Sequence, residues 1–425
     1  MRYLALTEND RQEMLRAVGL SNINELYDVV DNKDVLKKPI ENLPLHQGEF
    51  EVEKYISNLA SKNRPASSAP FFLGAGCYKH HVPASVDHLI QRSEFLTSYT
   101  PYQPEISQGT LAVIFQFQSI IALLTGMQVA NASLYDGATA MAESCLMAMR
   151  LKKGRKNIAI MPNIHPDYLE VTQTFLDLND TKFVEEIDES CACVIVQYPN
   201  FEGEIADLEN IRKKCDESGA LMVVVVNEIL ALGLLQAPKM ADIVVGEASS
   251  IGVGLNFGGP LLGFFACKKE FVRQMPGRIC GATTDKDGKN GYVLTLNARE
   301  QHIRREKATS NICSNQGLCA TAFTIHSSLL GEIGYKKLSL INHKKACDLA
   351  DRLEKINGVK VLNNSFFNEF TIELNKDAKE VNKLLLAKNI IGGFAKGNKM
   401  IVAVNEMTSD SDIEILATEL QKILN

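Results

Sequence analysis

The sequence predicts an α/β fold in which a large domain built on a mostly parallel sheet precedes a small C-terminal α/β domain. Strand-like and helix-like segments alternate between residues 137 and 267, and this alternation is typical of a parallel sheet covered by helices on both faces. The run LMVVVV at residues 221–226 is apolar throughout, as a central buried strand should be. After Gly317 long helices and short strands follow, which indicates the second domain.

The N-terminal segment, residues 1–70, is predicted to be helical. Thr7 and Asp10 have the spacing of a capping box, with Asp in place of the usual Glu, and the apolar residues that follow recur at helical spacing. Further helices are expected at residues 21–30 and 51–60. A polar, proline-containing loop then leads into the large domain.

The large domain, residues 71–316, should contain five strands separated in several places by helices. The expected strands are Ile158–Met161, Ala192–Gln197, Leu221–Val226, Asp242–Val245 and Leu261–Ala266, and the expected helices are Gly137–Leu151, Asp167–Leu176 and Ala206–Ser218. In residues 317–425 the pattern predicts long helices at 318–356 with a break near Gly331–Gly334, strands within 360–374 and 400–404, and helices at 379–388 and 410–424.

The composition is that of a globular protein, with 45% hydrophobic and 23% charged residues over 425 positions and a net charge of −6. Basic residues form no stripe, so we expect no nucleic-acid partner. There is no N-terminal signal pattern and no segment that approaches about 18 uncharged apolar residues, so we expect a cytoplasmic location and no membrane span.

The cysteines and histidines indicate no metal site. The ten cysteines are scattered and are expected to be reduced. Cys191 and Cys193 are separated by one residue, which fits one face of a strand, and no other Cys or His pair completes a zinc site. His80, His81 and His88 form the densest histidine group but have no convincing acidic co-ligand.

Residues 98–110, SYTPYQPEISQGT, form a polar loop before an apolar helix. Its prolines restrict the backbone locally, so the loop should be stiff. It presents Tyr99, Tyr102 and Glu105, and stiff polar loops carried on rigid elements often hold binding chemistry. These three residues are therefore the candidate functional side chains.

Two long segments carry a resemblance to a known family. They are GAGCYKHHVPASVDHLIQRSEFLTSYTPYQPEISQGT at residues 74–110 and FVRQMPGRICGATTDKDGKNGYVLTLNAREQHIRREKATSNICSNQ at residues 271–316. The chain resembles the P-protein family of the glycine cleavage system over nearly its whole length, and within it the alpha chain of the split form, subunit 1 of glycine dehydrogenase (decarboxylating). The resemblance implies the pyridoxal-phosphate-dependent fold type I, the aminotransferase-like architecture.

Enzymes of fold type I hold the cofactor on a lysine that follows a sheet strand and precedes a glycine-rich turn. Here the strand and the turn are present, but residues 241–267 contain no lysine. By resemblance, Ser249 and Ser250 stand where the catalytic subunit has His-Lys, so Ser250 replaces the aldimine lysine. Asn227 stands where these enzymes usually place the aspartate that pairs with the pyridine nitrogen, and Glu228 could substitute only if its side chain pointed inward.

Two further segments have alternative interpretations. Asp136 precedes a helix whose start would receive the cofactor phosphate in an active chain, but Asp136 can also simply cap that helix. Arg299, Arg304, Arg305 and Lys307 form either a basic patch or a solvated, ion-paired helix face. By resemblance to fold type I dimers, the adjacent Thr309, Ser310 and Asn311 would reach the phosphate of the partner's cofactor.

The resemblance implies that this chain is the lysine-lacking subunit of glycine decarboxylase. No cofactor would be bound covalently by this chain, and pyridoxal phosphate would be held by a second subunit in an α2β2 heterotetramer. The complex would decarboxylate glycine and pass the aminomethyl group to the lipoyl arm of H-protein, with Tyr99, Tyr102 and Glu105 acting in trans. Alone, the chain would be inactive.

Two other functions stay open at this point. One is a self-sufficient pyridoxal-phosphate decarboxylase or transaminase that uses another lysine, such as Lys268 or Lys307. The other is a purely structural pseudoenzyme subunit that contributes no residue to any active site.

Overall fold

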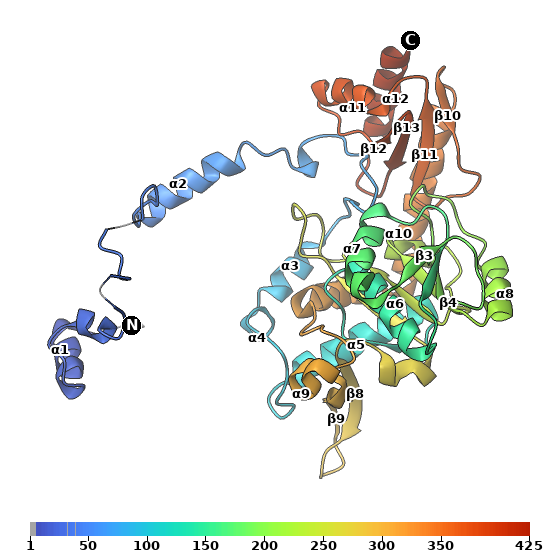
Figure 1. Cartoon of the computed structure of the whole chain (residues 1–425). Helices are drawn as coiled ribbons and strands as arrows, with labels where there is room; N and C mark the ends of the chain where they lie inside the picture. The colour runs from blue at the N-terminus through green and yellow to red at the C-terminus, as the bar shows by residue number, and fades with distance from the viewer. Residues whose placement is uncertain (1–5, 32, 39) are drawn as a thin grey trace. The chain divides into compact units, whose positions relative to one another are not determined.

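The computed structural model describes residues 6–31, 33–38 and 40–425 (Figure 1). The chain divides into two compact units, Met1–Arg64 and Pro65–Asn425. The first unit holds the helices α1 (Glu8–Ala17) and α2 (Glu49–Ala60) and the 3-10 turn η1 (Ile23–Tyr27). Thr7 caps α1 in a capping box with Asp10, as predicted.

The first unit has no buried core among its described residues, 6–31, 33–38 and 40–64. Helix α2 carries Val52, Tyr55, Ile56 and Leu59 at the spacing of one helix face, and all four are exposed. A helix of this length is marginally stable in water without tertiary packing. This apolar stripe is therefore a feature that the unit itself leaves uncovered.

The second unit is organised around a seven-stranded sheet with the order β1-β7-β6-β5-β4-β2-β3. Strands β3, β2, β4, β5 and β6 run parallel to one another, while β7 is antiparallel to both β6 and β1. The strands are β1 (Val129–Ala130), β2 (Asn157–Ile160), β3 (Lys182–Val184), β4 (Cys191–Gln197), β5 (Leu221–Val226), β6 (Ile243–Glu247) and β7 (Gly263–Cys267). The α/β fold with a mostly parallel sheet is thus confirmed.

Helices cover the two faces of this sheet and form two core layers. Helices α5 (Gln108–Thr125), α8 (Leu208–Ser218) and α10 (Gly317–Leu353) contribute to the layer that contains Val194 and Val224. Helices α6 (Gly137–Leu151) and α7 (Pro166–Leu176) contribute to the layer that contains Ile195 and Val225. Because neighbouring strand residues point to opposite faces, each strand needs apolar residues at every position, which explains the unbroken apolar runs.

Smaller elements complete the large domain. The hairpin of β8 (Ile279–Thr284) and β9 (Asn290–Thr295) packs against α5. The remaining helices here are α3 (Ala84–Ile90), α4 (Ser93–Leu96) and α9 (Gln301–Arg304). Short 3-10 turns lie at Ala66–Ser68, Asp177–Asn179, Ile229–Gly233, Lys269–Gln274, Asn297–Arg299 and Arg305–Lys307.

The C-terminal part forms a second, smaller sheet (orange to red in Figure 1). Helix α10 runs into it and is broken at Gly331, whose φ of 59° is left-handed, as the sequence predicts. The sheet order is β10-β11-β13-β12, and α11 (Ala378–Ala387) and α12 (Asp410–Leu424) belong to the same part. Its strands are β10 (Val359–Val361), β11 (Glu369–Leu374), β12 (Phe394–Lys396) and β13 (Lys399–Ala403).

Two expectations from the sequence are corrected by the structure. The spacing of Cys191 and Cys193 predicts one shared strand face, but Cys191 packs in one core layer and Cys193 in the other. The pairing of β2 with β4 shifts register at this point, which turns the two side chains to opposite faces. All ten cysteines are free thiols.

The second correction concerns α5, which has 18 residues and no charged side chain. Among the described residues it is the one helix that is long and apolar enough to cross a membrane by length and composition. Six of its side chains are buried in this chain, while Leu123 is 81% exposed. The expectation that no segment approaches about 18 uncharged apolar residues is therefore wrong for Gln108–Thr125.

Candidate functional site

The carboxyl ends of β4, β5 and β6 meet at one edge of the sheet, where α/β folds place their ligand crevice. Residues 198–201 follow β4, Asn227 and Glu228 follow β5, and Ser250 follows β6 after a short turn. Ser250 stands at the position of the absent lysine and Asn227 at that of the absent aspartate. Both therefore lie at the same edge of the sheet.

A chain of hydrogen bonds crosses this crevice. Ser250 Oγ donates to Glu228 Oε2 at 3.0 Å, and His80 Nε2 lies 3.0 Å from the same oxygen. His80 Nδ1 lies 2.9 Å from Glu406 Oε2. The side chain of Glu228 thus points inward, and it is engaged by protein groups on both sides.

Ion pairs between His80 and two glutamates stabilise this series of hydrogen-bonded side chains. His80 is buried, which disfavours its charged form, but Glu228 and Glu406 outweigh the burial and raise the pKa of His80 to about 10. Burial also opposes ionisation of Glu406, yet the bonds from His80 and from the backbone N–H of His81 lower its pKa to about 2. His80 is therefore a buried imidazolium between two carboxylates at neutral pH.

A second buried carboxyl group lies beside this chain. Glu369 accepts hydrogen bonds from the backbone N–H of Ala75 and from Tyr78 Oη, the latter at 3.1 Å. Burial raises its pKa to about 7 against the effect of these two bonds, and the nearby charge of Glu228 adds to the rise. Glu369 comes from β11, so the small domain contributes directly to the crevice.

One cavity within this crevice has almost no free volume. A cavity of about 10 Å³ is lined by residues that include Tyr78, Gln197, Asn227, Glu228 and Glu369. A single water needs roughly 10–15 Å³, and small-molecule sites are typically about 300–1,000 Å³. The space is thus no larger than one water molecule.

The helix start that would receive a phosphate is also occupied by protein carboxylates. Asp136 Oδ1 accepts the N–H of Thr139 at 2.7 Å, so the capping interpretation of Asp136 is confirmed. Glu247 Oε2 accepts the N–H of Gly137 at 3.1 Å. Two carboxylates at the N-terminus of α6 would repel an anionic group and already use its amides.

The residues of this crevice therefore do not fit pyridoxal phosphate. No amine is present at Ser250, the two strand-end groups are a neutral amide and a carboxylate already paired with His80, and the phosphate position is taken. The serine removes the covalent attachment point, and the paired carboxylates disfavour the pyridine ring and the phosphate.

The candidate loop residues lie on the surface, outside this network. Tyr99 is 75% exposed and Glu105 is exposed. Tyr102 is 56% exposed, but its hydroxyl oxygen accepts a hydrogen bond from Arg278 Nη2 at 3.1 Å. Three functional side chains proposed from the sequence are thus grouped on one loop and available to a partner.

The segment of Thr309, Ser310 and Asn311 packs partly on its own chain. The N–H of Thr309 donates to the carbonyl of Arg299 at 3.0 Å, and Ser310 Oγ accepts the N–H of Ile312 at 3.1 Å. Arg299 itself donates to the carbonyl oxygens of residues 275, 277 and 296. Arg299 is therefore a structural arginine, while Arg304, Arg305 and Lys307 are exposed.

Metal ligation has no support in the part of the chain that the structure describes, where no three His, Cys, Asp or Glu side chains are placed to hold an ion. His80 is engaged by two carboxylates, and His88 is exposed on α3.

Comparisons with known proteins decide the family. The family model of the glycine cleavage system P-protein matches residues 1–420. This chain belongs to the P-protein family. Proteins of Parvibaculum lavamentivorans and Erythrobacter litoralis, each named probable glycine dehydrogenase (decarboxylating) subunit 1, are 51% identical to it, and the matches cover 100% of both chains in each case.

Solved structures agree with the P-protein assignment. A crystal structure of glycine decarboxylase (P-protein) of the glycine cleavage system, in inhibitor-bound form, is 39% identical, with a TM-score of 0.94 and full coverage of both chains. Mouse CSAD, at 13% identity, has a TM-score of 0.69 over 91% of this chain and shows the shared fold alone. The predicted fold type I architecture is thereby confirmed.

Two residues of the crevice, and one that holds the loop of residues 98–110, were not predicted from the sequence. Glu369, Glu406 and Arg278 belong to no local motif, since they reach their partners from segments more than 150 residues away in the chain. The one available signal was the Asn227-Glu228 pair at the strand end, which replaces a single aspartate by two polar residues.

Proposed function

We propose that this chain is the lysine-lacking subunit of a split glycine decarboxylase. With a second subunit that holds pyridoxal phosphate, it would release the carboxyl group of glycine as CO2. The complex would transfer the aminomethyl group to one sulfur of the lipoyl disulfide of H-protein, in the cytoplasm. The observation that carries this proposal is the crevice filled by Ser250, Glu228, His80 and Glu406. The relatives named subunit 1 support a second subunit as partner.

Exposed apolar surface supports an obligate partner. Helix α5 leaves Leu123 81% exposed, and the loop after β6 leaves Phe257 78% exposed. The stripe of α2 adds four more apolar side chains. Exposed apolar side chains of this kind are what an obligate interface buries, since obligate interfaces are more hydrophobic than transient ones.

The contribution in trans would come from Tyr99, Tyr102 and Glu105, with Thr309–Asn311 reaching the phosphate of the partner's cofactor. Phenols can donate hydrogen bonds to carboxylate or phosphate oxygens, and a carboxylate can relay a proton. The exposure of Tyr99, Tyr102 and Glu105 supports this role, because side chains that serve a partner must be reachable from outside.

A self-sufficient enzyme is less well supported. Lys268 Nζ is bonded to Asp242, which precedes β6, so it lies at the opposite edge of the sheet from the crevice. Lys307 is exposed on a 3-10 turn. A purely structural role for the chain remains the second alternative, and loop variants described below distinguish it from a contribution in trans.

Activity of the separated and combined subunits tests the proposal. We expect exchange of labelled bicarbonate into glycine, with H-protein present, for the co-purified pair and none for this chain alone with added pyridoxal phosphate. A partner subunit that is fully active without this chain would reduce it to a structural role. Exchange by the isolated chain would support the self-sufficient enzyme instead.

A further inference from the structure

Arg278 links the two surface segments that the proposed function assigns to the partner's site. It precedes β8 and is only 3% exposed. Its Nη2 donates to Tyr102 Oη at 3.1 Å and to the carbonyl of Cys313 at 2.7 Å, and its Nη1 donates to Ser314 Oγ at 3.1 Å. One guanidinium thus joins the loop of residues 98–110 to the segment that follows Asn311.

The charge of Arg278 is balanced within this chain. Its Nε lies 3.6 Å from Glu300 Oε2, and both side chains are buried. The guanidinium carbon lies 5.5 Å from the centre of the Tyr102 ring, within the range of a cation–π contact. The ring of His302 meets the Tyr102 ring edge-on, with the ring centres 6.0 Å apart. Tyr102 is therefore fixed in orientation although more than half of it is exposed.

The direction of the Arg278–Tyr102 hydrogen bond leaves the hydroxyl hydrogen of Tyr102 free to donate. Arginine can only donate, so Tyr102 Oη must be the acceptor in this bond. The hydroxyl hydrogen then points elsewhere, and no group in the described part of the chain accepts it. A tyrosine held in this way offers a hydrogen-bond donor to whatever approaches its exposed side.

We infer that Arg278 is a positioning residue that fixes Tyr102 as an outward-facing donor to an anionic oxygen, carboxylate or phosphate, at the partner subunit's site. This inference rests on the proposed function, because it requires that Tyr102 acts across the subunit interface. Arg278 itself touches no substrate, since it is buried and both of its Nη atoms are bonded within this chain. Its effect on turnover passes through Tyr102.

A double-mutant cycle in the co-purified complex tests this inference. Tyr102→Phe removes only the hydroxyl, and Arg278→Lys keeps a positive charge beside Glu300 but loses the planar fork. We expect each variant to lower kcat/KM for glycine about tenfold, and we expect the double variant to be no worse than either single one. A rise in KM would point to the glycine carboxylate as acceptor, and a fall in kcat to an oxygen met in the transition state.

Arg155→Lys is the matched control, because Arg155 also holds backbone carbonyls, those of Cys191 and Ser218, at the opposite edge of the sheet. It should change kcat/KM less than twofold, and melting temperatures of all variants separate loss of folding from loss of function. Full activity of Tyr102→Phe would overturn both the role of Tyr102 in trans and this inference. An impaired Tyr102→Phe with strictly additive losses in the double variant, about a hundredfold, would overturn this inference alone.

Discussion

Single side chains in the crevice of this chain form an internal polar network. Glu228 accepts from Ser250 and pairs with His80, and His80 in turn pairs with Glu406. Replacing His80 would leave the buried side chains of Glu228 and Glu406 without their shared cationic partner, and breaking a buried ion pair costs about 3–5 kcal/mol in proteins. The groups that fill the crevice therefore also stabilise the packing of the segments that they join.

Single substitutions in the loop of residues 98–110 should reduce turnover without disrupting the complex. For Tyr99→Phe and Glu105→Gln we expect glycine decarboxylation to fall about tenfold or more, the scale of about 1.4 kcal/mol in the barrier. The physical reason is that both side chains are exposed and polar, so neither is needed for the core of this chain. Labelled bicarbonate exchange and the cofactor content of the partner are the measurements. Exchange at the wild-type rate in an intact complex, with Tyr99, Tyr102 and Glu105 all altered, would show that the loop is a scaffold.

At the scale of elements, the inner strands could be predicted and the outer ones could not. The predicted strands 192–197 and 221–226 match β4 and β5 closely because a strand buried on both faces is apolar at every position. Strands β1 and β3 are only two and three residues long, and β8 and β9 fully bury only Ile279 and Cys280, so they carry no such signal. The shift that separates Cys191 from Cys193 depends on pairing with β2 and has no local pattern.

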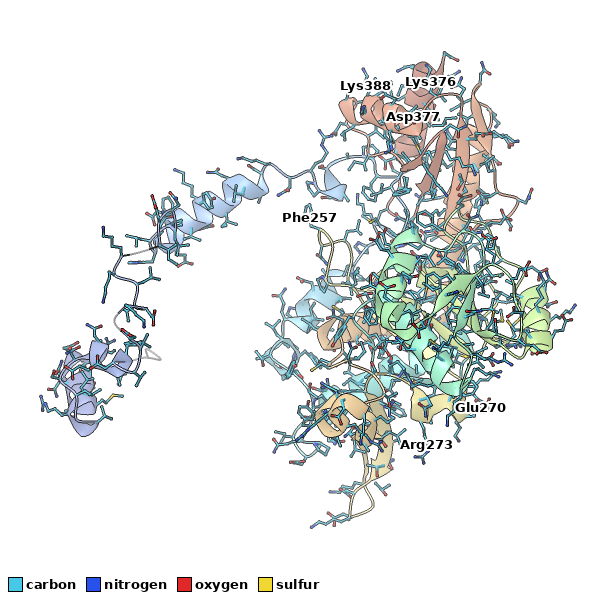
Figure 2. The ribbon with its side chains drawn as sticks, viewed as in Figure 1. Phe257, Glu270, Arg273, Lys376, Asp377 and Lys388 are labelled. Carbon is cyan, nitrogen blue, oxygen red and sulfur yellow. The ribbon has the colours of Figure 1, made fainter. Side chains whose placement is uncertain are left out.

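The loop between β6 and β7 is the element best suited to anchor a partner. Figure 2 shows Phe257 at the tip of this loop, and Leu255 and Leu261 beside it are each 40% exposed. Phe257 has a φ of 53°, a conformation that bulky residues rarely adopt. A strained, exposed aromatic side chain indicates selection for contact rather than for packing within the chain.

Phe257→Ser should weaken association with the partner subunit. Burying a phenylalanine is worth about 1.5–3 kcal/mol, so we expect the dissociation constant to rise by about 10- to 100-fold. Analytical ultracentrifugation of the mixed subunits gives the measurement. Leu384→Ser, at an exposed leucine of α11 in the small domain, is the matched control and should leave the affinity unchanged. Equal affinities for both variants would remove this loop from the interface.

At the scale of the whole molecule, the crevice joins the large and small domains. Glu369 and Glu406 come from the C-terminal part, while Glu228 and Ser250 come from the large domain, with Tyr78 and His80 between them. The sequence predicts both domains from periodicity, but it cannot show which polar residues of one face the other. That pairing depends on how the two domains pack, so the network could only be found in the structure.

Glu369 gives this junction a pH dependence. Its pKa is raised from 4.5 to about 7 in the folded chain, so between these values the folded state binds more protons than the unfolded state and stability falls as pH rises. Glu369→Gln can still accept from Ala75 and can donate to Tyr78, and it does not titrate. We therefore expect the variant to gain stability relative to wild type, by a few kcal/mol, as pH rises from 5 to 8 in denaturant titrations. A constant difference over this range would contradict a raised pKa at Glu369.

Under the proposed function, this chain has no cofactor site of its own and the second subunit supplies it. Borohydride reduction of the active complex, followed by peptide mass spectrometry of both subunits, tests this claim most directly. We predict that pyridoxyl-lysine is found on the partner subunit alone, at one per partner chain, and that every lysine of this chain is unmodified. A stoichiometric pyridoxyl group on any lysine of this chain would contradict the claim.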